Sequence, residues 1–248
     1  MLGGWRRVVA VVFVARLGAR RGRGWLDMGG GPGALSLGLA ARCRPRAVVG
    51  LDRSPGFLRA ARAAAPAPAR FAVADASALP FHDAVFDAAV SGLALNFLEP
   101  PGPAVAEAAR VVRPGGLVAA YVWDYTEGMG LLRRFWDAAA SVDPAAAPLD
   151  EGRRFPLCRP GPLRALWTGA GLADVTVAPI EVSTVFRAFA DLWEPFLSGQ
   201  GPAPGYVATL APAARDRLRT RLAATLPTGP DGSVSLAARA WAVRGRRP

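Results

Sequence analysis

Three observations predict that this chain of 248 residues folds as a doubly wound α/β sheet. Short apolar segments alternate with helical segments from Gly24 to Tyr125. Four glycines and one proline fill positions 29–33, directly after the first apolar segment. Asp52 and Asp75 stand at the ends of the next two apolar segments. A strand–helix–strand rhythm gives parallel strand pairs with right-handed crossovers, and ligands of such sheets bind beyond the carboxyl ends of the strands.

The elements of the first half follow one another closely. The strands are short apolar runs such as "AVVGLD", and the helices are longer segments that proline or glycine ends. Pro66 ends the second helix, and the "RPGG" turn at 113–116 closes the third. The predicted strands are 25–29, 47–52, 70–76, 86–92 and 117–125. The predicted helices are 34–43, 55–65 and 103–112.

The second half is less regular. It predicts a helix over 161–172, a strand over 174–182 that Pro179 breaks, and a final strand over 236–245. The stretch 185–226 is predicted to be helical and is rich in aromatic residues. Stretches of the chain that lie between core elements can cover a ligand site at the carboxyl edge of the sheet.

Composition and charge limit the partners. The net charge is +11, and all of the positive side-chain charge at neutral pH comes from arginine, because the chain has no lysine. A basic chain can indicate nucleic-acid binding, but these arginines are dispersed, and the abundance of Ala, Gly and Pro indicates a compositional bias. A small-molecule substrate is therefore preferred over nucleic acid.

Two distant cysteines and one histidine form no disulfide or zinc pattern, so we expect no metal and a cytoplasmic location. The oligomeric state is left open.

The apolar run "VVAVVFVA" at 8–15 follows Arg6 and Arg7 and resembles a short signal peptide. Cleavage after it would fall almost against the first core strand. The run is also shorter than the roughly 18–20 residues that span a membrane. We therefore expect an N-terminal helix that belongs to the fold, and no membrane span.

The glycine turn fits two nucleotide cofactors. Glycine permits positive φ and lets a ligand touch the backbone, and the helix that follows offers free N–H groups at its positive end. Gly29, Gly31 and Ala34 satisfy the GxGxx[GA] pattern of NAD sites. In S-adenosylmethionine sites an acidic residue precedes GxGxG, and here these residues are Asp27, Gly29, Gly31 and Gly33. Asp27 favours the second cofactor, because a carboxylate repels a pyrophosphate and pairs with the α-ammonium of methionine.

Two further acidic residues follow strands. Asp52, 19 residues after Gly33, can accept hydrogen bonds from both ribose hydroxyls, which NAD and S-adenosylmethionine both need. Alternatively, it is a strand-end carboxylate that caps the helix after Pro55. Asp75 can accept a hydrogen bond from the adenine amino group while the Ala76 N–H meets a ring nitrogen; the alternative is an ordinary turn aspartate.

Together these residues resemble the class I S-adenosylmethionine-dependent methyltransferases, of the small-molecule type near the ubiquinone/menaquinone-biosynthesis methyltransferases. The matching motifs across about residues 24–125 are "LDMGGGPG", "VVGLDRSPGFLRAAR", "VADASALPF", "FDAAVSGLALNFL" and "ARVVRPGGLVAAYVWDY". The resemblance implies a Rossmann-like, doubly wound seven-stranded sheet whose last strand, 236–245, is antiparallel. It also implies one methyltransferase domain over 1–248, with an N-terminal helix in 1–23, a cofactor-binding core at 24–125, and helical cover segments at 126–160 and 185–232.

The resemblance also implies roles for single residues. Asp27 and the glycines would hold the methionine portion of S-adenosyl-L-methionine, Asp52 the ribose, and Asp75 with Ala76 the adenine. The loop from Ser91 to Leu93 would lie beside the sulfonium. The full set of implied cofactor contacts is Asp27, Gly29, Gly31, Gly33, Asp52, Arg53, Asp75, Ala76, Ser91 and Leu93.

The implied chemistry is an in-line SN2 transfer, in which the cofactor supplies the electrophile and the protein supplies alignment and exclusion of water. We assign no residue as catalytic. His82 lies in a connection between two strands and is expected on the surface, while Glu99, Asp124 and Tyr125 follow strands at the ligand edge. Candidate contacts to the acceptor are Asn96, Trp123, Tyr125 and Trp136. For the aromatic residues, packing is the equally weighted alternative.

Two rival functions remain. An NAD-dependent oxidoreductase is disfavoured by Asp27 and by the absence of the Tyr-x-x-x-Lys pair of one large dehydrogenase group. A non-catalytic cofactor-binding module of the same fold stays open because no base is assigned. The sequence also lacks an Asn/Asp-Pro-Pro-Tyr motif and a Pro-Cys nucleophile, which counts against methylation of nucleic-acid bases.

Overall fold

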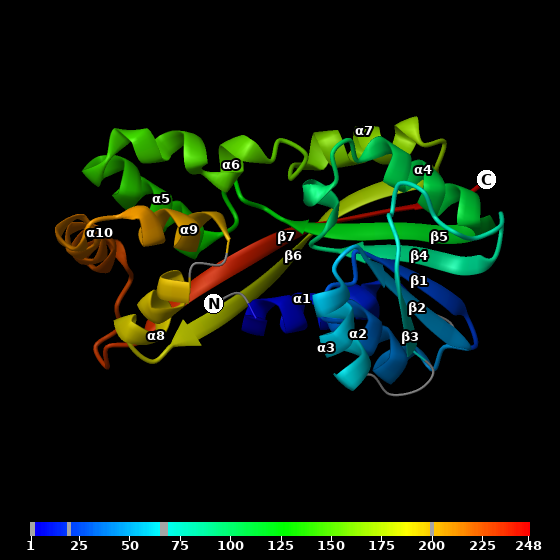
Figure 1. Ribbon diagram of the computed structural model, residues 1–248, viewed down its shortest axis with the longest axis horizontal. Helices are drawn as coiled ribbons and strands as arrows, with labels where there is room; N and C mark the ends of the chain where they lie inside the picture. Colours follow the sequence, from blue (N-terminus) through cyan, green and yellow to red (C-terminus); the bar gives the residue numbers. More distant parts are fainter. Residues whose placement is uncertain (1–2, 19–20, 65–68, 199–200) are drawn as a thin grey trace. The chain divides into compact units, whose positions relative to one another are not determined.

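The computed structural model describes residues 3–18, 21–64, 69–198 and 201–248. The chain divides into two compact units (Figure 1). The sheet unit comprises Arg6–Val122, Arg159–Ile180 and Ala240–Pro248. The aromatic unit comprises Met1–Trp5, Trp123–Cys158 and Glu181–Arg239. This division does not test the expected single domain over 1–248, which stays a prediction.

The strands form one seven-stranded mixed sheet in the order β3-β2-β1-β4-β5-β7-β6. They are β1 (Gly24–Met28), β2 (Ala47–Asp52), β3 (Ala69–Val73), β4 (Phe86–Gly92), β5 (Val112–Trp123), β6 (Ala173–Phe186) and β7 (Val234–Arg246). The pairs β1–β2, β1–β4, β2–β3 and β4–β5 are parallel. Strand β7 runs antiparallel to β5, because Gly115 N–H donates to Arg247 O while Asp124 N–H donates to Arg239 O. The predicted fold class and the antiparallel last strand are confirmed.

Helix starts follow local sequence rules. The α-helices are α1 (Gly3–Arg16), α2 (Ala34–Cys43), α3 (Pro55–Ala64), α4 (Gly102–Val111), α5 (Gly130–Val142), α6 (Glu151–Arg154), α7 (Pro160–Gly169), α8 (Phe189–Trp193), α9 (Pro202–Thr209) and α10 (Pro212–Thr225). The 3₁₀ helices are η1 (Leu95–Phe97), η2 (Pro144–Leu149) and η3 (Glu194–Ser198). Helices α3, α7, α9 and α10 begin with proline, whose fixed φ suits the first turn. The expected helix end at Pro66 lies outside the described residues.

Helices cover both faces of the parallel part of the sheet. Figure 1 shows α1, α2 and α3 on one face and α4 and α7 on the other. The inner strand β1 is buried along its whole length, as expected for a parallel strand covered on both faces. On one face, the Phe13 ring of α1 packs against Tyr121 of β5 at a centroid distance of 4.7 Å. On the other, the Trp167 indole N–H of α7 donates to Val118 O at 3.0 Å.

The sequence predicted that the "RPGG" segment is a turn before the fifth strand. In the structure this segment is part of strand β5. Strand β5 begins at Val112 and runs through Arg113–Gly116 as an irregularity opposite Asp87. Gly115 N–H donates to Arg247 O, and Arg247 N–H donates to Gly116 O, so β7 satisfies this segment's backbone groups. A partner more than a hundred residues away in the chain therefore overrides the local turn signal.

The expected break at Pro179 is also wrong. Strand β6 continues from Ala173 to Phe186 without interruption. It is the last strand of the sheet, and an edge strand tolerates a residue that has no N–H to donate. The carbonyl of Pro179 accepts a hydrogen bond from the Arg16 guanidinium at the end of α1.

Helices α5, α6, α8, α9 and α10 of the aromatic unit fall within the ranges 126–160 and 185–232, and the covering role expected of these two segments stays a prediction. Helix α5 contacts α10, η2 and α9. The rings of Phe135 and Phe196 stack at a centroid distance of 4.5 Å with an interplanar angle of 10°. A partly buried ion pair joins Asp124 to Arg239 of β7, with 2.7 Å between Oδ2 and Nε. These contacts give this unit its own core.

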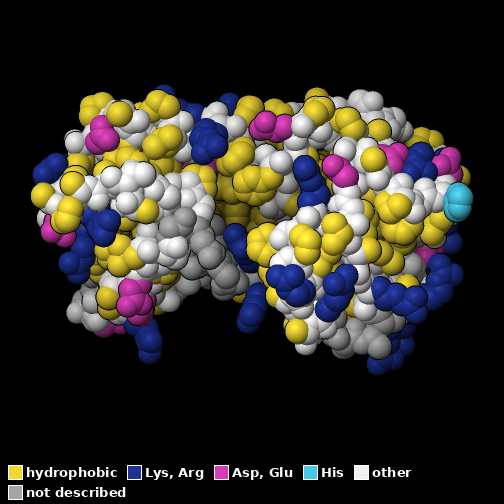
Figure 2. All heavy atoms as spheres, viewed as in Figure 1, with side chains coloured by type: hydrophobic (Ala, Val, Ile, Leu, Met, Phe, Trp, Pro, Cys, Tyr) yellow, Lys and Arg dark blue, Asp and Glu magenta, His cyan; other side chains and the backbone are white. Residues whose placement is uncertain are grey.

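Across the described ranges, no helix combines the length and apolarity needed to cross a bilayer. Figure 2 shows the arginine side chains distributed over the displayed face among apolar and neutral atoms. The single histidine, His82, is exposed, as the sequence indicated.

Replacing Trp167 with phenylalanine tests how α7 is anchored. The variant keeps an aromatic ring but removes the buried hydrogen bond from the indole N–H to Val118 O. We expect the free energy of unfolding to fall by about 1–3 kcal/mol in urea denaturation. Phe57→Leu, at an exposed site on α3, should change it by less than about 0.5 kcal/mol. Equal midpoints for the two variants would contradict this account.

Candidate functional site

The loop between β1 and α2 requires glycine for two different reasons. Gly29, Gly31 and Gly33 have φ of +70°, +52° and +92°, in the left-handed region that favours glycine. A Cβ on Gly29 would lie 2.4 Å from the Cβ of Ala94, in the loop after β4. A Cβ on Gly31 would meet no atom within 4 Å. Gly29 therefore lets two loops pack together, and Gly31 leaves open space above the backbone.

Asp27 is the penultimate residue of the buried strand β1, and one of its carboxylate oxygens is hydrogen-bonded while the other is not. Its side chain is fully buried, and Oδ2 accepts a hydrogen bond of 2.6 Å from the Ser36 hydroxyl of α2. Oδ1 is also buried and has no hydrogen-bond partner among the described residues. Burial raises the pKa of Asp27 to about 6, although hydrogen bonds from Ser36 act in the opposite direction. The free oxygen is an acceptor suited to a cationic donor.

Asp52 lies at the end of β2 and holds the glycine loop. Its Oδ2 accepts the Gly31 N–H at 3.0 Å, and its Oδ1 accepts the Ser54 N–H at 2.8 Å. The second bond resembles the alternative role, a carboxylate at the start of α3. Each carboxylate oxygen keeps a further lone pair. Both interpretations of Asp52 are therefore compatible with its geometry.

Asp75 lies in the turn two residues beyond the end of β3. Its Oδ1 accepts hydrogen bonds from the Ser77 N–H at 2.8 Å and the Ser77 hydroxyl at 2.7 Å. These bonds lower the pKa of Asp75 and keep it ionised. The Arg53 Nε lies 3.9 Å from Asp75 Oδ2, but both side chains are exposed and the pair is weak. Ala76 is buried beside them.

Two buried polar side chains flank the turn after β4, because Ser91 lies in β4 and Asn96 lies in η1. Ser91 Oγ and Asn96 Nδ2 have no hydrogen-bond partner within the described part of the chain. Between them, Leu93 has φ of +58°, and its N–H donates to Tyr121 O at 2.8 Å. A left-handed leucine is uncommon, so the turn is held in a strained form. Ala94, which contacts Gly29, brings this loop against the glycine loop.

The aromatic acceptor candidates are packed inside the aromatic unit. Trp123 meets Trp5 edge to face at a centroid distance of 6.5 Å, and Tyr125 lies 5.5 Å from the ring of Phe155. The Trp136 indole N–H donates to Glu151. These contacts show the packing role that the sequence offered as the alternative. An additional role in substrate binding stays a prediction.

Other titratable candidates have structural partners or lie on the surface. Asp124 is buried and bonded to Arg239 and to the N–H groups of Thr126 and Glu127. Glu99 is exposed. Among the residues with described coordinates, no cluster of His, Cys, Asp and Glu could hold a metal ion.

Sequence reasoning missed two residues that shape the Asp27 environment. Ser36 donates to Asp27, and a polar residue in the otherwise apolar helix "ALSLGLAARC" was its only signal. Gly50 pairs with Asp27 across β1 and β2. A Cβ at Gly50 would lie 3.0 Å from Ser36 Oγ and 2.6 Å from the Phe71 ring. A glycine inside a strand marks such a close approach.

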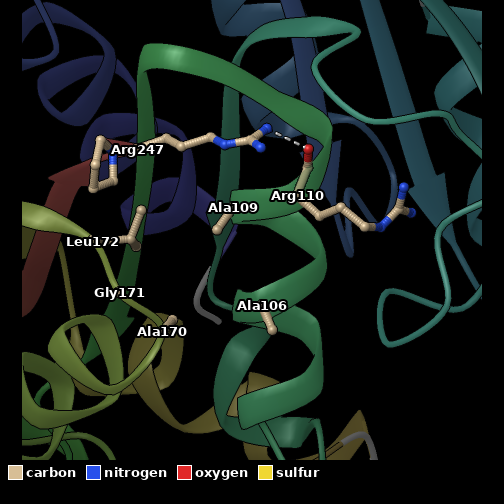
Figure 3. A pocket seen from close by; sticks show the side chains of 8 residues that line it. Ala106, Ala109, Arg110, Ala170, Gly171, Leu172 and Arg247 are labelled. Atoms are coloured by element: carbon tan, nitrogen blue, oxygen red, sulfur yellow. Dashed lines mark hydrogen bonds between the residues drawn. The ribbon is translucent and has the colours of Figure 1, made fainter.

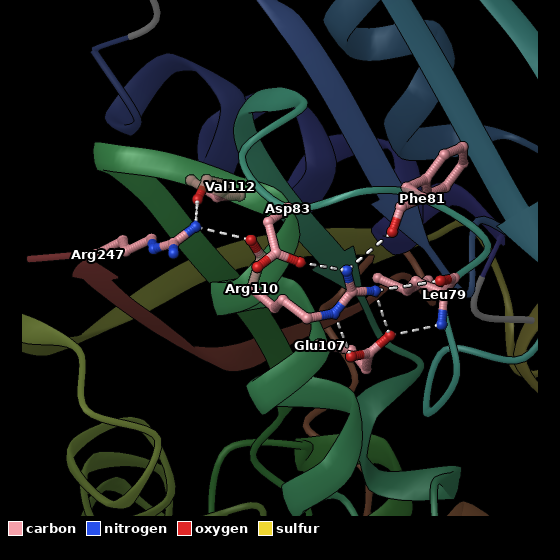
Figure 4. Close-up of polar contacts among 7 residues, drawn as sticks. All are labelled: Leu79, Phe81, Asp83, Glu107, Arg110, Val112 and Arg247. Carbon is pink, nitrogen blue, oxygen red and sulfur yellow. Dashed lines mark hydrogen bonds and ion pairs between the residues drawn. The ribbon is translucent and has the colours of Figure 1, made fainter.

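A separate pocket of about 420 Å³ lies between α4, the end of α7 and the end of β7 (Figure 3). Its lining residues are Ala106, Ala109, Arg110, Ala170, Gly171, Leu172, Arg247 and Pro248. The Arg247 guanidinium donates to the carbonyls of Arg110 and Val112. The Arg110 guanidinium turns away and bonds Glu107, Asp83 and the carbonyls of Leu79 and Phe81 (Figure 4). The guanidinium groups of Arg110 and Arg247 are thus bonded to backbone carbonyls and to carboxylates of the chain itself, and we assign no ligand to this pocket.

Part of this chain is similar to known proteins. Residues 26–120 match the family described as "Methyltransferase domain". A malonyl-[acyl-carrier protein] O-methyltransferase of Pseudescherichia vulneris is 41% identical over 114 residues, which are 46% of this chain and 44% of that protein. A ubiquinone/menaquinone biosynthesis C-methyltransferase UbiE of Cupriavidus metallidurans is 32% identical over 143 residues, 55% of this chain and 57% of that protein. The chain thus spans about half the length of the curated relatives it matches.

Solved structures show the same fold. A phosphoethanolamine N-methyltransferase 2 of Haemonchus contortus, in complex with S-adenosyl-L-methionine, superposes with a TM-score of 0.61. The match covers 96% of this chain and 52% of that protein at 18% identity.

The contact between Gly29 and Ala94 can be tested by a double-mutant cycle. We expect Gly29→Ala to lower the free energy of unfolding by about 2–4 kcal/mol, through φ strain and overlap with Ala94. Gly31→Ala, with strain only, should lower it by about 1–2 kcal/mol. Adding Ala94→Gly should restore about 1 kcal/mol or more to Gly29→Ala and nothing to Gly31→Ala. Additive effects in both pairs would refute the contact.

Proposed function

We propose that this chain, whose residues 26–120 match a methyltransferase-domain family, is a class I S-adenosylmethionine-dependent methyltransferase that transfers a methyl group from S-adenosyl-L-methionine to a small-molecule acceptor. The reaction is an in-line SN2 displacement. We also propose that it takes place in the cytoplasm.

The single observation that carries the proposal is the free oxygen of Asp27. Oδ1 is a buried acceptor with no partner in the described ranges, at the end of the strand that leads into the glycine loop. A buried acceptor needs a donor, and a charged donor forms the stronger bond. The α-ammonium of the methionine portion is such a donor, whereas a pyrophosphate beside Asp27 would be repelled. The residues present therefore fit S-adenosylmethionine better than NAD.

The other predicted contacts agree with this assignment. Asp52, with lone pairs remaining on both oxygens, would accept the ribose hydroxyls, and Arg53 follows it at the surface. Asp75 with Ala76 would meet the adenine edge, although its Oδ1 already accepts two bonds from Ser77. Gly31 and Gly33 would let the cofactor approach the backbone.

The chain's own part in the reaction is binding, orientation and exclusion of water. S-adenosylmethionine supplies the electrophilic methyl group when it is bound. The loop from Ser91 to Leu93 would lie beside the sulfonium, and Asn96 would orient a polar group of the acceptor. The side-chain amide of Asn96 cannot accept a proton at neutral pH, so we assign no general base. Trp123, Tyr125 and Trp136 remain proposed walls of the acceptor site.

The rivals gain little support. No observation favours an oxidoreductase. A non-catalytic module of the same fold would bind the cofactor and show no turnover over a broad acceptor panel, which separates it from the proposed enzyme. The named relatives act on a carrier-bound malonyl group and in quinone biosynthesis. A small organic acceptor is the class we propose for this chain, with nucleic acid disfavoured.

Calorimetric titration tests cofactor binding directly. We expect the purified chain to bind S-adenosylmethionine and S-adenosylhomocysteine, and Asp52→Ala to weaken binding at least about tenfold by removing a charged acceptor. Asp231→Ala removes an exposed turn aspartate, whose carboxylate accepts hydrogen bonds from Ser233, and should leave the affinity unchanged. No binding of either ligand to the wild type, or fluorescence enhancement of NADH on mixing, would refute the proposal.

The pKa of Asp27 predicts how binding depends on pH. The ammonium pairs with the ionised carboxylate, so protons compete with the ligand below a pKa of about 6. We expect the Kd of S-adenosylhomocysteine to rise towards tenfold per unit as the pH falls below 6, and to stay flat from pH 7 to 8.5. The measurement is a titration series at constant ionic strength. A flat profile down to pH 5 would contradict the role of Asp27.

A further inference from the structure

Ser36 and Asp27 form an isolated buried pair. Both side chains have a relative exposure of 0%, and 2.6 Å separates Ser36 Oγ from Asp27 Oδ2. A hydroxyl has a single proton to donate, so this bond uses the whole donor capacity of the Ser36 side chain. The bond occupies Oδ2 and leaves Oδ1 as the free acceptor of the carboxylate.

The surrounding backbone keeps this pair in place. Ser36 is the third residue of α2, where backbone N–H groups still lack helical partners, and its N–H also stabilises the ionised Asp27. On β2, Gly50 stands in register with Asp27. Because a Cβ there would lie 3.0 Å from Ser36 Oγ, Gly50 gives the hydroxyl its space. Helix, strand and turn therefore converge on one hydrogen bond.

Few other charged groups act on this pair. Asp52 disfavours the charge on Asp27, and so does burial. On β5, the Tyr121 hydroxyl is buried near Asp27, whose charge helps to raise the tyrosine pKa, and Arg6 of α1 acts on Tyr121 in the opposite direction. Ser36 is thus the main group that favours the ionised carboxylate.

We propose that Ser36 is a positioning residue for the ammonium group of the cofactor. Its hydroxyl holds Oδ2 of Asp27, directs Oδ1 to the ligand, and keeps the carboxylate ready to accept a cation. This inference rests on the proposed function, since it assigns a role within the same cofactor site.

The consequence appears in the pH dependence of binding. A hydrogen bond to a charged group favours ionisation by a factor of roughly ten or more. The affinity for the cofactor decreases below a certain pH. Removing the Ser36 hydroxyl therefore raises that pH by about one unit or more. Loss of a purely structural contact would weaken binding equally at every pH.

The experiment compares three variants at position 36 by titration with S-adenosylhomocysteine from pH 5 to 9. Ser36→Ala removes the hydroxyl, and Ser36→Cys keeps a side chain of similar size that is only a weak donor. For both variants, the ratio of Kd to the wild-type Kd should be at least about fivefold larger at pH 6 than at pH 9. Ser36→Thr keeps the hydroxyl and should follow the wild type. Ser141→Ala removes a serine hydroxyl that donates to Ala138 O on α5 and should match the wild type throughout. A uniform loss, or an unchanged profile, in Ser36→Cys overturns the proposal.

A second measurement separates this inference from the proposed function. Carbon-13 NMR of labelled aspartate carboxyls in the chain without cofactor, with Asp27→Asn to assign the signal, reports the Asp27 titration directly. An upward shift of its midpoint in Ser36→Cys supports the role of the hydroxyl. An unshifted midpoint overturns it even if the cofactor binds. If the wild type binds no S-adenosylhomocysteine while the midpoint shifts, the proposed function fails and the hydrogen bond stands.

Discussion

The buried carboxylate of Asp27 is the constraint on which the carboxyl edge of the sheet unit depends. Burying such a group is costly unless donors compensate, and here the donors come from the first turn of α2. The space around it explains nearby glycines. A Cβ on Gly30 would lie 3.1 Å from Asp27 Oδ2, and one on Gly50 would press on Ser36. The end of β1, the start of α2 and the middle of β2 are thus shaped by one group.

Much of the fold was predictable because its signals are local. The bounds of α2, β2 and β4 equal those expected, since apolar runs and glycine or proline boundaries define them within a few residues. The errors concern Arg113–Gly116 and Pro179. In both places the outcome depends on a neighbour distant in the chain: β7 pairs with the first segment, and the second lies on an edge strand. Sequence periodicity contains no information about such pairings.

For the candidate site, the sequence selects some residues and misses others, and their roles stay predictions. Acidic residues at strand ends and glycines at fixed spacing follow from the ligand they would hold, so Asp27, Asp52 and Asp75 could be selected. Ser36 and Gly50 could not, because their importance comes from contact with Asp27 rather than from any spacing. The roles of Trp123 and Trp136 were left open, and their packing partners became visible only in the folded aromatic unit.

The division into two units has a consequence for how this chain can be cut or recombined. Neither unit is one continuous stretch, and the boundaries at 180/181 and 239/240 fall within strands β6 and β7 rather than in loops. A truncation after Val122 would remove part of the sheet together with the whole aromatic segment that follows. Neither unit can therefore be transferred to another protein as one continuous segment of this chain.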